Sequence, residues 1–333
     1  MKILVIQTAS IGDVILATPV NEGLHHAYPS AEIDLMVKKG MEGLFKGHPY
    51  IRRLILWDKS EKYKDFLRIL MDVRKSRYDL VVNMQRFALT GLLTAFSGAS
   101  DTIGFSKNPF SFLFSKRVPH LIGKGVHEVE RNISLIRSVT PAGQRALGFG
   151  SVPRPKLYPS PSDEARVLPY KTRPYVTISP ASLWYTKQYP AEKWVELIRT
   201  LQPGLQVYLL GSVSDITLCE EIRDSSANEA IQVLAGNLSL LESAALMKEA
   251  LLNFTNDSAP MHLASAVNAA VAVVYCSTIP EFGFGPLSER NWIIQTREEL
   301  KCRPCGLHGR KECPLQHFKC ANGISPGQFP SRL

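Results

Sequence analysis

The stretch Asn256-Asp257-Ser258-Ala259-Pro260-Met261-His262 decides the fold, because it predicts a strand that runs into the N-terminus of a helix. Apolar segments precede and follow it, at 250–255 and 263–267. Asp257 can cap such a helix, and Pro260 suits its first turn. Backbone N–H groups near Ser258 and Ala259 would then lie at the positive end of the helix dipole, where a diphosphate binds well. An ordinary capped helix after a buried strand explains the same stretch equally well.

A second junction of this kind opens the chain. Residues Lys2–Ile6 form a mostly apolar run, 8–13 forms a turn, and apolar residues at helical spacing follow. Gly12 permits close approach to the backbone, and Asp13 would project from the carboxyl edge of a sheet, where open α/β folds bind ligands. The turn is not a dinucleotide fingerprint, because Gly12 is the only one of the three expected glycines that is present. It is not a P-loop either, because no Gly-Lys-Ser/Thr follows.

Strand and helix patterns alternate along both halves of the chain. The apolar runs predict strands at 3–6, 33–37, 54–57, 80–82, 175–178, 207–210, 231–234, 251–254 and 270–275, with helical patterns near 14–27, 61–77 and 87–97 in the first half. This alternation predicts α/β domains with parallel sheets. A proline-rich segment at about 150–174 predicts an extended connector. We therefore expect two doubly wound, Rossmann-like domains, at 1–155 and 170–333, that face each other across a cleft.

Composition and charge narrow the class of protein. A chain of 333 residues with 45% hydrophobic and 21% charged residues is typical of a soluble globular protein. No uninterrupted apolar run reaches the roughly 18 residues of a membrane span, so we expect a cytoplasmic location. Residues 1–150 hold 21 Lys and Arg against 13 Asp and Glu. This basic half indicates an anionic partner such as a phosphorylated glycolipid, a membrane surface or a nucleic acid, although a solvated surface explains it as well. Within it, 105–117 interleaves aromatic and basic residues, as a lipid-contacting segment or a buried loop with basic flanks does.

The six cysteines form two groups. Cys219 and Cys276 lie in apolar surroundings, which predicts buried thiols. The other four, at 302, 305, 313 and 320, begin with a C-x2-C pair. Their spacing leaves a structural zinc site and reduced thiols both open.

Taken in order along the chain, the motifs resemble a known family. They are Ser10-Ile11-Gly12-Asp13, Asn83-Met84-Gln85-Arg86, His127-Glu128-Val129-Glu130-Arg131-Asn132, Ser179-Pro180-Ala181 with Thr186-Lys187, and 256–262. The chain thereby resembles the ADP-heptose:lipopolysaccharide heptosyltransferases of glycosyltransferase family 9. The cysteine-rich stretch 302–317 is most similar to heptosyltransferase II and its relatives. The chain departs from the common pattern at Ala9, Asn83 and Gln188, none of which we assign to chemistry.

The resemblance implies a GT-B fold and an inverting glycosyltransferase that moves a heptose from ADP-heptose to the inner core of lipopolysaccharide. It implies that Asp13 is the general base and that Lys187 neutralises the ADP leaving group. The remaining substrate-binding candidates are Ser10, Gly12, Asp257, Ser258, Ala259 and His262. The N-terminal half would receive the acceptor and the C-terminal half the nucleotide sugar. We expect no cofactor, no catalytic metal and no nucleic-acid partner, and we expect peripheral contact with the inner membrane.

Each candidate residue also has a structural explanation. Asp13 and Asp257 can be helix caps, Lys187 a surface charge and His262 a core histidine. Two other functions remain open as well. One is a related glycosyltransferase that uses another nucleotide sugar, and the other is a catalytically idle protein that binds a nucleotide or a glycolipid.

Overall fold

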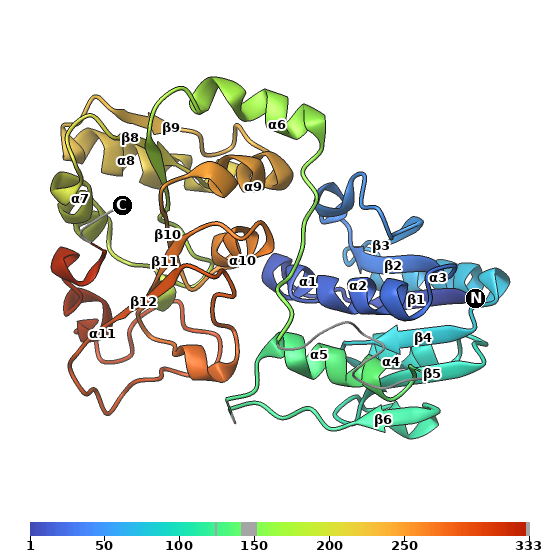
Figure 1. Cartoon of the computed structure of the whole chain (residues 1–333). Helices are drawn as coiled ribbons and strands as arrows, with labels where there is room; N and C mark the ends of the chain where they lie inside the picture. Colours follow the sequence, from blue (N-terminus) through green and yellow to red (C-terminus); the bar gives the residue numbers. More distant parts are fainter. Residues whose placement is uncertain (124, 141–151, 331–333) are drawn as a thin grey trace. The chain divides into compact units, whose positions relative to one another are not determined.

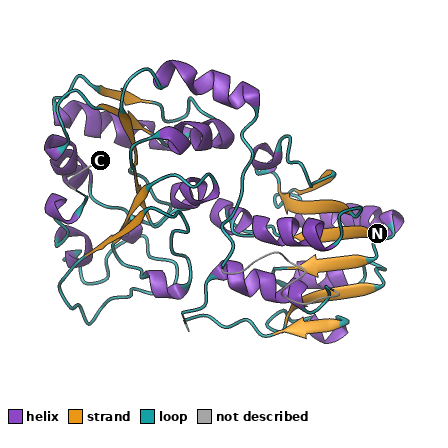
Figure 2. Ribbon diagram, in the orientation of Figure 1, coloured by secondary structure: helices purple, strands orange, loops and turns teal. Residues whose placement is uncertain are grey.

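The computed structural model describes residues 1–123, 125–140 and 152–330. The chain divides into two compact units, Met1–Tyr158 and Pro159–Leu333. Each unit is a six-stranded sheet with helices packed on it (Figures 1 and 2). The boundary after Tyr158 falls within the connector that the prolines predict. The start of that connector, 150–151, lies outside the described residues.

The first unit carries a sheet in the order β3-β2-β1-β4-β5-β6. Its strands are β1 (Lys2–Ile6), β2 (Glu32–Lys38), β3 (Arg53–Trp57), β4 (Leu80–Asn83), β5 (Asp101–Phe105) and β6 (Lys116–Val118), and all neighbours are parallel. Its helices are α1 (Ile11–Ile15), α2 (Thr18–Ala27), α3 (Lys62–Ser76), α4 (Ala88–Ala95) and α5 (Glu128–Arg137), with short 3₁₀ turns η1 (Glu42–Phe45) and η2 (Ser111–Leu113).

The second unit has the order β12-β11-β10-β7-β8-β9. Its strands are β7 (Tyr175–Ser179), β8 (Gln206–Leu209), β9 (Ile231–Val233), β10 (Asn253–Asn256), β11 (Val271–Tyr275) and β12 (Asn291–Gln295), again all parallel. Its helices are α6 (Pro161–Val167), α7 (Ala191–Thr200), α8 (Ile216–Ser226), α9 (Leu240–Glu249), α10 (Ala259–Ala266) and α11 (Lys319–Asn322). The 3₁₀ turns are η4 (Leu168–Tyr170), η5 (Tyr185–Lys187), η6 (Val213–Asp215), η7 (Pro280–Phe282) and η8 (Pro326–Gln328).

Both sheets have the strand order of a Rossmann fold. In each unit the order reverses between the first strand and the fourth, which are β1 and β4 in the first unit and β7 and β10 in the second. Ligands of open α/β sheets bind beyond the carboxyl ends of the strands at such a reversal. A ligand of either unit is therefore expected at the loops that follow these four strands. The predicted α/β class and the parallel sheets are confirmed.

Two details of the sequence prediction are wrong, and three strands were missed. The connector is not extended throughout, because α6 begins at Pro161, a residue whose fixed φ suits the first helical position. The strand before the 256–262 stretch begins later than predicted and includes Asn256. The edge strands β6 and β12 and the inner strand β5 had no prediction, since each is short or interrupted by polar residues.

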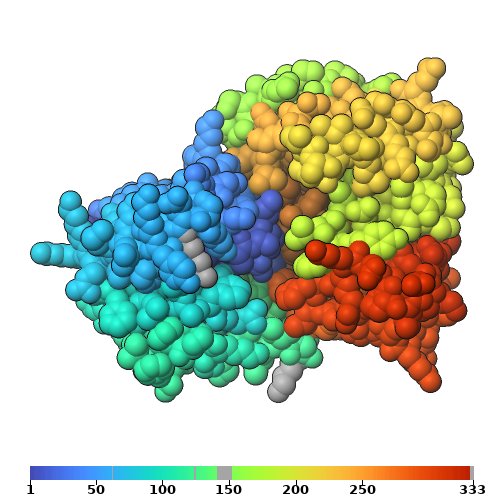
Figure 3. All heavy atoms as spheres, turned by 180° about the vertical axis from the view of Figure 1, so that it is seen from behind, coloured from blue at the N-terminus to red at the C-terminus, as the bar shows by residue number. Residues whose placement is uncertain are grey.

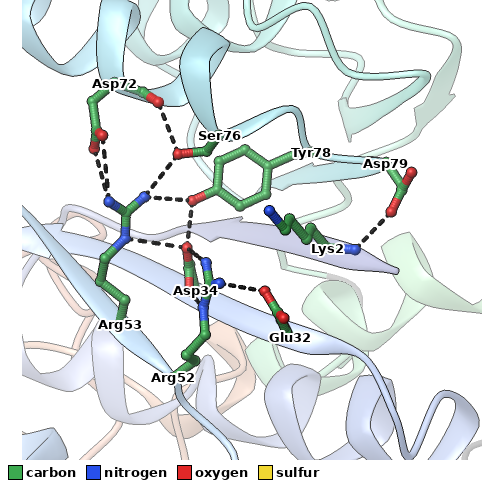
Figure 4. A network of polar contacts seen from close by, with 9 residues as sticks. All are labelled: Lys2, Glu32, Asp34, Arg52, Arg53, Asp72, Ser76, Tyr78 and Asp79. Carbon is green, nitrogen blue, oxygen red and sulfur yellow. Dashed lines mark hydrogen bonds and ion pairs between the residues drawn. The ribbon is translucent and has the colours of Figure 1, made fainter.

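A buried carboxylate ties α3 to the first sheet (Figure 4). Asp34 in β2 is fully buried and accepts hydrogen bonds from Arg52, Arg53 and the Tyr78 hydroxyl. Burial raises the pKa of Asp34, but the hydrogen bonds from Arg52 and Tyr78 outweigh it and hold that pKa below its ordinary value. Arg53 also donates to the Ser76 hydroxyl at the end of α3.

None of the described helices has the length and the apolar character that crossing a membrane requires.

Candidate functional site

In the first unit, Asp13 lies at the start of α1, directly beyond the carboxyl end of β1. Ser10 is the N-cap of this helix, and its hydroxyl donates to Asp13 Oδ2 over 2.5 Å. The Ser10 amide donates to the same oxygen over 3.2 Å, and the Asp13 amide donates back to Ser10 Oγ over 3.4 Å. Asp13 is half-buried. The capping box therefore orients this carboxylate at the edge of the sheet where the strand order reverses.

Buried amide side chains link the loops that follow β1 and β4. The side chain of Gln85, after β4, donates to the side chain of Gln7, after β1. The Asn83 side chain accepts a hydrogen bond from the backbone N–H of Gln85 over 2.8 Å and donates one to the Thr90 carbonyl over 2.9 Å. Asn83, one of the departures from the family pattern, thus has a scaffolding role in which it fixes the turn that follows β4.

A cation stands at the same edge of the first sheet. Lys59, after β3, donates to the Thr8 carbonyl over 2.6 Å. Burial lowers the pKa of Lys59 below its ordinary value, and the charge of Lys38 adds to this effect. The edge that holds Asp13 therefore also holds positive charge.

In the second unit, Lys187 and Asp257 form an ion pair. Lys187 Nζ lies 2.8 Å from Asp257 Oδ2, and their side chains are 15% and 8% exposed. The Thr278 hydroxyl donates to the same carboxylate oxygen over 2.6 Å. The explanation of Lys187 as a solvated surface charge is therefore wrong, because its ammonium is mostly buried against a carboxylate.

Asp257 is not the helix cap that the sequence predicted. Strand β10 runs through Asn256, so the Asp257 amide still donates to the Val274 carbonyl of β11. The N-cap of α10 is Ser258, whose side chain makes no capping hydrogen bond. Pro260 lies in the first turn, as predicted. The carboxylate of Asp257 is thus directed to Lys187 and Thr278 rather than to the helix backbone.

The helix N-terminus is held next to this ion pair. Asn256 accepts from the Tyr189 amide over 2.9 Å and donates to the Pro180 carbonyl over 2.7 Å, which links β10 to the loop after β7. Ala259 is the first residue of α10, and His262, one turn on, is 5% exposed. The site therefore combines a cation, a carboxylate and the positive end of a helix dipole.

Sequence reasoning missed the polar residues after β11 that complete this cluster. Besides Thr278, the Ser277 hydroxyl donates to Thr186 Oγ1 over 3.0 Å, and the Arg310 amide donates to the same oxygen over 2.8 Å. The signal was present, because Ser277 and Thr278 follow the apolar run of β11 almost directly, at the carboxyl edge of the sheet.

The cysteine-rich loop 302–317 packs against Lys187. An added Cβ atom on Gly309, whose φ is +79°, would lie 2.9 Å from Lys187 Cγ and 3.1 Å from Trp184 Cβ. Arg303 anchors the loop through hydrogen bonds of 2.8 Å to the carbonyls of Cys276 and Thr278. The loop therefore lies against the aliphatic part of the Lys187 side chain.

The cysteines are all free thiols. Cys219 and Cys276 are buried as predicted, and burial raises the pKa of Cys219 to about 12. The other four line a cavity of about 60 Å³ together with His317. Cys302 Sγ and His317 Nε2 are 4.0 Å apart. In the described ranges, no three His, Cys, Asp or Glu side chains are arranged so that they could hold a metal ion.

Comparisons with known proteins show which family the chain is similar to. Residues 66–317 match the family model described as glycosyltransferase family 9 (heptosyltransferase). The chain is 29% identical over 286 residues to lipopolysaccharide heptosyltransferase 3 of Escherichia coli K12, covering 80% of each chain. It is 24% identical over 333 residues to lipopolysaccharide heptosyltransferase 1 of Pseudomonas aeruginosa, covering 95% of this chain and 88% of the relative.

The fold has solved counterparts. The structure of E. coli ADP-heptose lps heptosyltransferase II superposes with a TM-score of 0.78 at 23% identity, covering 98% of this chain and 96% of that one. This similarity confirms the GT-B fold with two Rossmann-like domains. Since the family model spans most of the chain, the protein belongs to glycosyltransferase family 9, the heptosyltransferases.

Proposed function

We propose that the protein transfers a heptose from ADP-heptose to the inner core of lipopolysaccharide, with inversion at the anomeric carbon. The observation that carries this proposal is the Lys187–Asp257–Thr278 cluster beside the N-terminus of α10, in a chain of the heptosyltransferase family. Solved structures of the E. coli heptosyltransferase WaaC with ADP and with ADP-2-deoxy-2-fluoro heptose support the choice of donor.

In the proposed reaction the second unit binds the donor. The diphosphate lies at the N-terminus of α10, where the amides of Ser258 and Ala259 meet it, and His262 lies one turn further on. Lys187 neutralises the charge that develops on ADP as the glycosidic bond to the phosphate breaks. Asp257 holds the ammonium of Lys187 in place before the donor binds, and its carboxylate accepts hydrogen bonds from sugar hydroxyls.

The first unit supplies the base and receives the acceptor. Asp13 takes the proton of the acceptor hydroxyl as that oxygen attacks the anomeric carbon. Ser10 donates to the carboxylate and fixes its orientation, and Gly12 lets the backbone approach the substrate closely. A single displacement inverts the configuration. The cations of this unit, such as Lys59, attract the acidic groups of the acceptor.

This function places the reaction at a membrane surface. The acceptor is a glycolipid, so we propose that the protein works in the cytoplasm and contacts the inner membrane peripherally. No cofactor takes part in the proposed reaction.

Incubation of the purified protein with ADP-heptose and a series of inner-core acceptors, with and without heptose already attached, tests this proposal. We expect release of ADP and an acceptor whose mass grows by one heptose, with the anomeric configuration inverted in the NMR spectrum. Transfer only from another nucleotide sugar would identify a related glycosyltransferase. Binding of ADP-heptose without any transfer would identify an idle binding protein.

A further inference from the structure

Helix α3 of the first unit carries large apolar side chains on its outer side. Its inner side packs into the core through Ile69 and Val73, which are fully buried. On the outer side, Tyr63 is 71%, Leu67 59% and Met71 67% exposed. Residues four apart differ by about 40° around a helix axis, so these three form one stripe. A stripe of this kind on the surface of a globular unit indicates a contact with something apolar.

Basic residues share the outer side with this stripe. Helical spacing puts Lys64, Arg68, Arg74 and Lys75 there, and all four are exposed. Residues 62–76 contain five Lys and Arg against two Asp. Of these two acids, Asp65 is 8% exposed and lies at the border with the core. The outer side of α3 is therefore both apolar and basic.

Neighbouring elements extend this surface. Arg74 of α3 donates to the Phe96 carbonyl at the end of α4, and Asn108, before η2, donates to the Phe87 carbonyl at the start of α4. We call the combined surface the α3 face, and its exposed apolar residues are Tyr63, Leu67, Met71, Phe87, Phe96, Phe112 and Leu113. They are seven of the nine large exposed apolar residues in the described part of the first unit. Figure 3 shows α3 in light blue beside the turquoise residues that follow it.

The orientation of α3 is fixed. Arg53 in β3 connects Asp34 of the sheet to Asp72 and Ser76 in the last turns of the helix (Figure 4). With this network at one end and Ile69 and Val73 in the core, the helix cannot turn its outer apolar stripe inward.

We propose that the α3 face docks the protein on the surface of an anionic lipid bilayer. We choose this partner because the charges are complementary. The exposed apolar groups can enter the interface of the bilayer, and the cations that flank them attract its acidic headgroups. The helices α1, α3 and α4 all begin beyond carboxyl ends of strands, so the first turn of α3 lies at the same sheet edge as Asp13. This inference rests on the proposed function for its purpose, which is to bring a lipid-linked acceptor to that edge.

Co-sedimentation with vesicles tests the docking surface directly. We expect the wild-type protein to sediment with vesicles of phosphatidylethanolamine and phosphatidylglycerol, and much less with phosphatidylcholine alone. The double substitution Leu67→Gln/Met71→Gln should weaken binding about five- to tenfold, because two apolar groups no longer enter the interface. Lys64→Gln/Lys75→Gln should weaken binding to the anionic vesicles only.

A matched control is Leu168→Gln in the second unit, where the leucine is 66% exposed. It should bind vesicles like the wild type, and circular dichroism should show all variants folded. Equal sedimentation of wild type and Leu67→Gln/Met71→Gln overturns the proposal. So does a wild-type dimer in light scattering that this variant abolishes, since a second copy then covers the face.

The vesicle assay is independent of the proposed reaction. If heptose transfer is absent but the substitutions still weaken sedimentation, the proposed function fails and the docking surface stands. If transfer occurs, Leu67→Gln/Met71→Gln should leave the turnover of a delipidated, water-soluble acceptor unchanged.

Discussion

Lys187 and Asp257 lie 2.8 Å apart at the carboxyl edge of the second sheet, with both side chains largely buried. A buried pair of this kind has a strong geometric preference, and removing one partner leaves the other charge uncompensated. Asp257 therefore holds the Lys187 ammonium in the position that the proposed function requires.

Replacement of Lys187 tests its role in donor binding. Lys187→Ala should lower kcat/KM for the nucleotide sugar by about 10- to 100-fold, because a charge-assisted contact to phosphate is lost. Steady-state kinetics with varied donor measures this effect. Lys193→Ala is the matched control, since Lys193 forms an ion pair of the same 2.8 Å length with Glu196 on the surface of the same unit. If the two variants have equal donor kinetics, Lys187 does not contact the donor.

Gly309 should be a positioning residue for Lys187. Gly309→Ala puts a methyl group 2.9 Å from Lys187 Cγ, so the lysine stem must move and its ammonium leaves its place. We expect the donor KM to rise by about tenfold, within the roughly 10²-fold that a misplacement of about 1 Å can cost.

Gly306 provides the control for this substitution. Its φ is +88°, close to the +79° of Gly309, but an added Cβ meets nothing within 4 Å. Gly306→Ala therefore carries a similar backbone strain without touching the lysine. A double-mutant cycle separates the two effects, because Gly309→Ala should change donor KM little when Lys187 is already alanine. Additive effects would show that Gly309 acts on something else.

Asp13→Asn should lower turnover by roughly 10²- to 10⁴-fold while leaving ADP binding nearly unchanged, because a base is lost but the donor contacts remain. Isothermal titration with ADP and a turnover assay measure the two quantities. Asp163→Asn is a close control, since Ser160 and Asp163 form the same capping box at the start of α6, with a hydroxyl-to-carboxylate distance of 2.6 Å. Both substitutions remove the carboxylate of a capping box. A lower turnover in Asp13→Asn than in Asp163→Asn therefore indicates a catalytic role for Asp13, and equal turnover contradicts it.

The sequence predicted the fold well where strands are long and apolar. The runs at 3–6 and 175–178 are buried over their whole length, as parallel strands are, and their strands are confirmed. The short strand β6, at Lys116–Val118, is exposed at two of its three residues and has no apolar pattern. Its position depends on pairing with β5, a tertiary contact that local sequence does not encode.

The site was predictable in its residue types but not in its contacts. The motif 256–262 correctly indicated a strand followed by a helix, and Pro260 marked the first helical turn. The cap was assigned to Asp257 because spacing alone cannot tell an N-cap from the last residue of a sheet ladder. The partner of Asp257, Thr278, comes from the loop after β11, 21 residues later in the chain.

His48 should make the stability of the first unit depend on pH. The residue is 7% exposed, and its ring packs edge-on against the ring of Tyr158 with 4.9 Å between the centroids. Burial lowers the pKa of His48 to about 4. Because the ordinary value is 6.5, the unfolded chain takes up a proton between pH 6.5 and 4 that the folded unit does not. The contribution of His48 to the free energy of unfolding is therefore fully present above pH 6.5, and this free energy should fall by roughly 3 kcal/mol as the pH drops to 4.

Urea unfolding at several pH values should show this loss in the wild type and in His26→Gln, an exposed-histidine control, and a clearly smaller loss in His48→Phe. The same slope in His48→Phe would assign the pH dependence to groups other than His48.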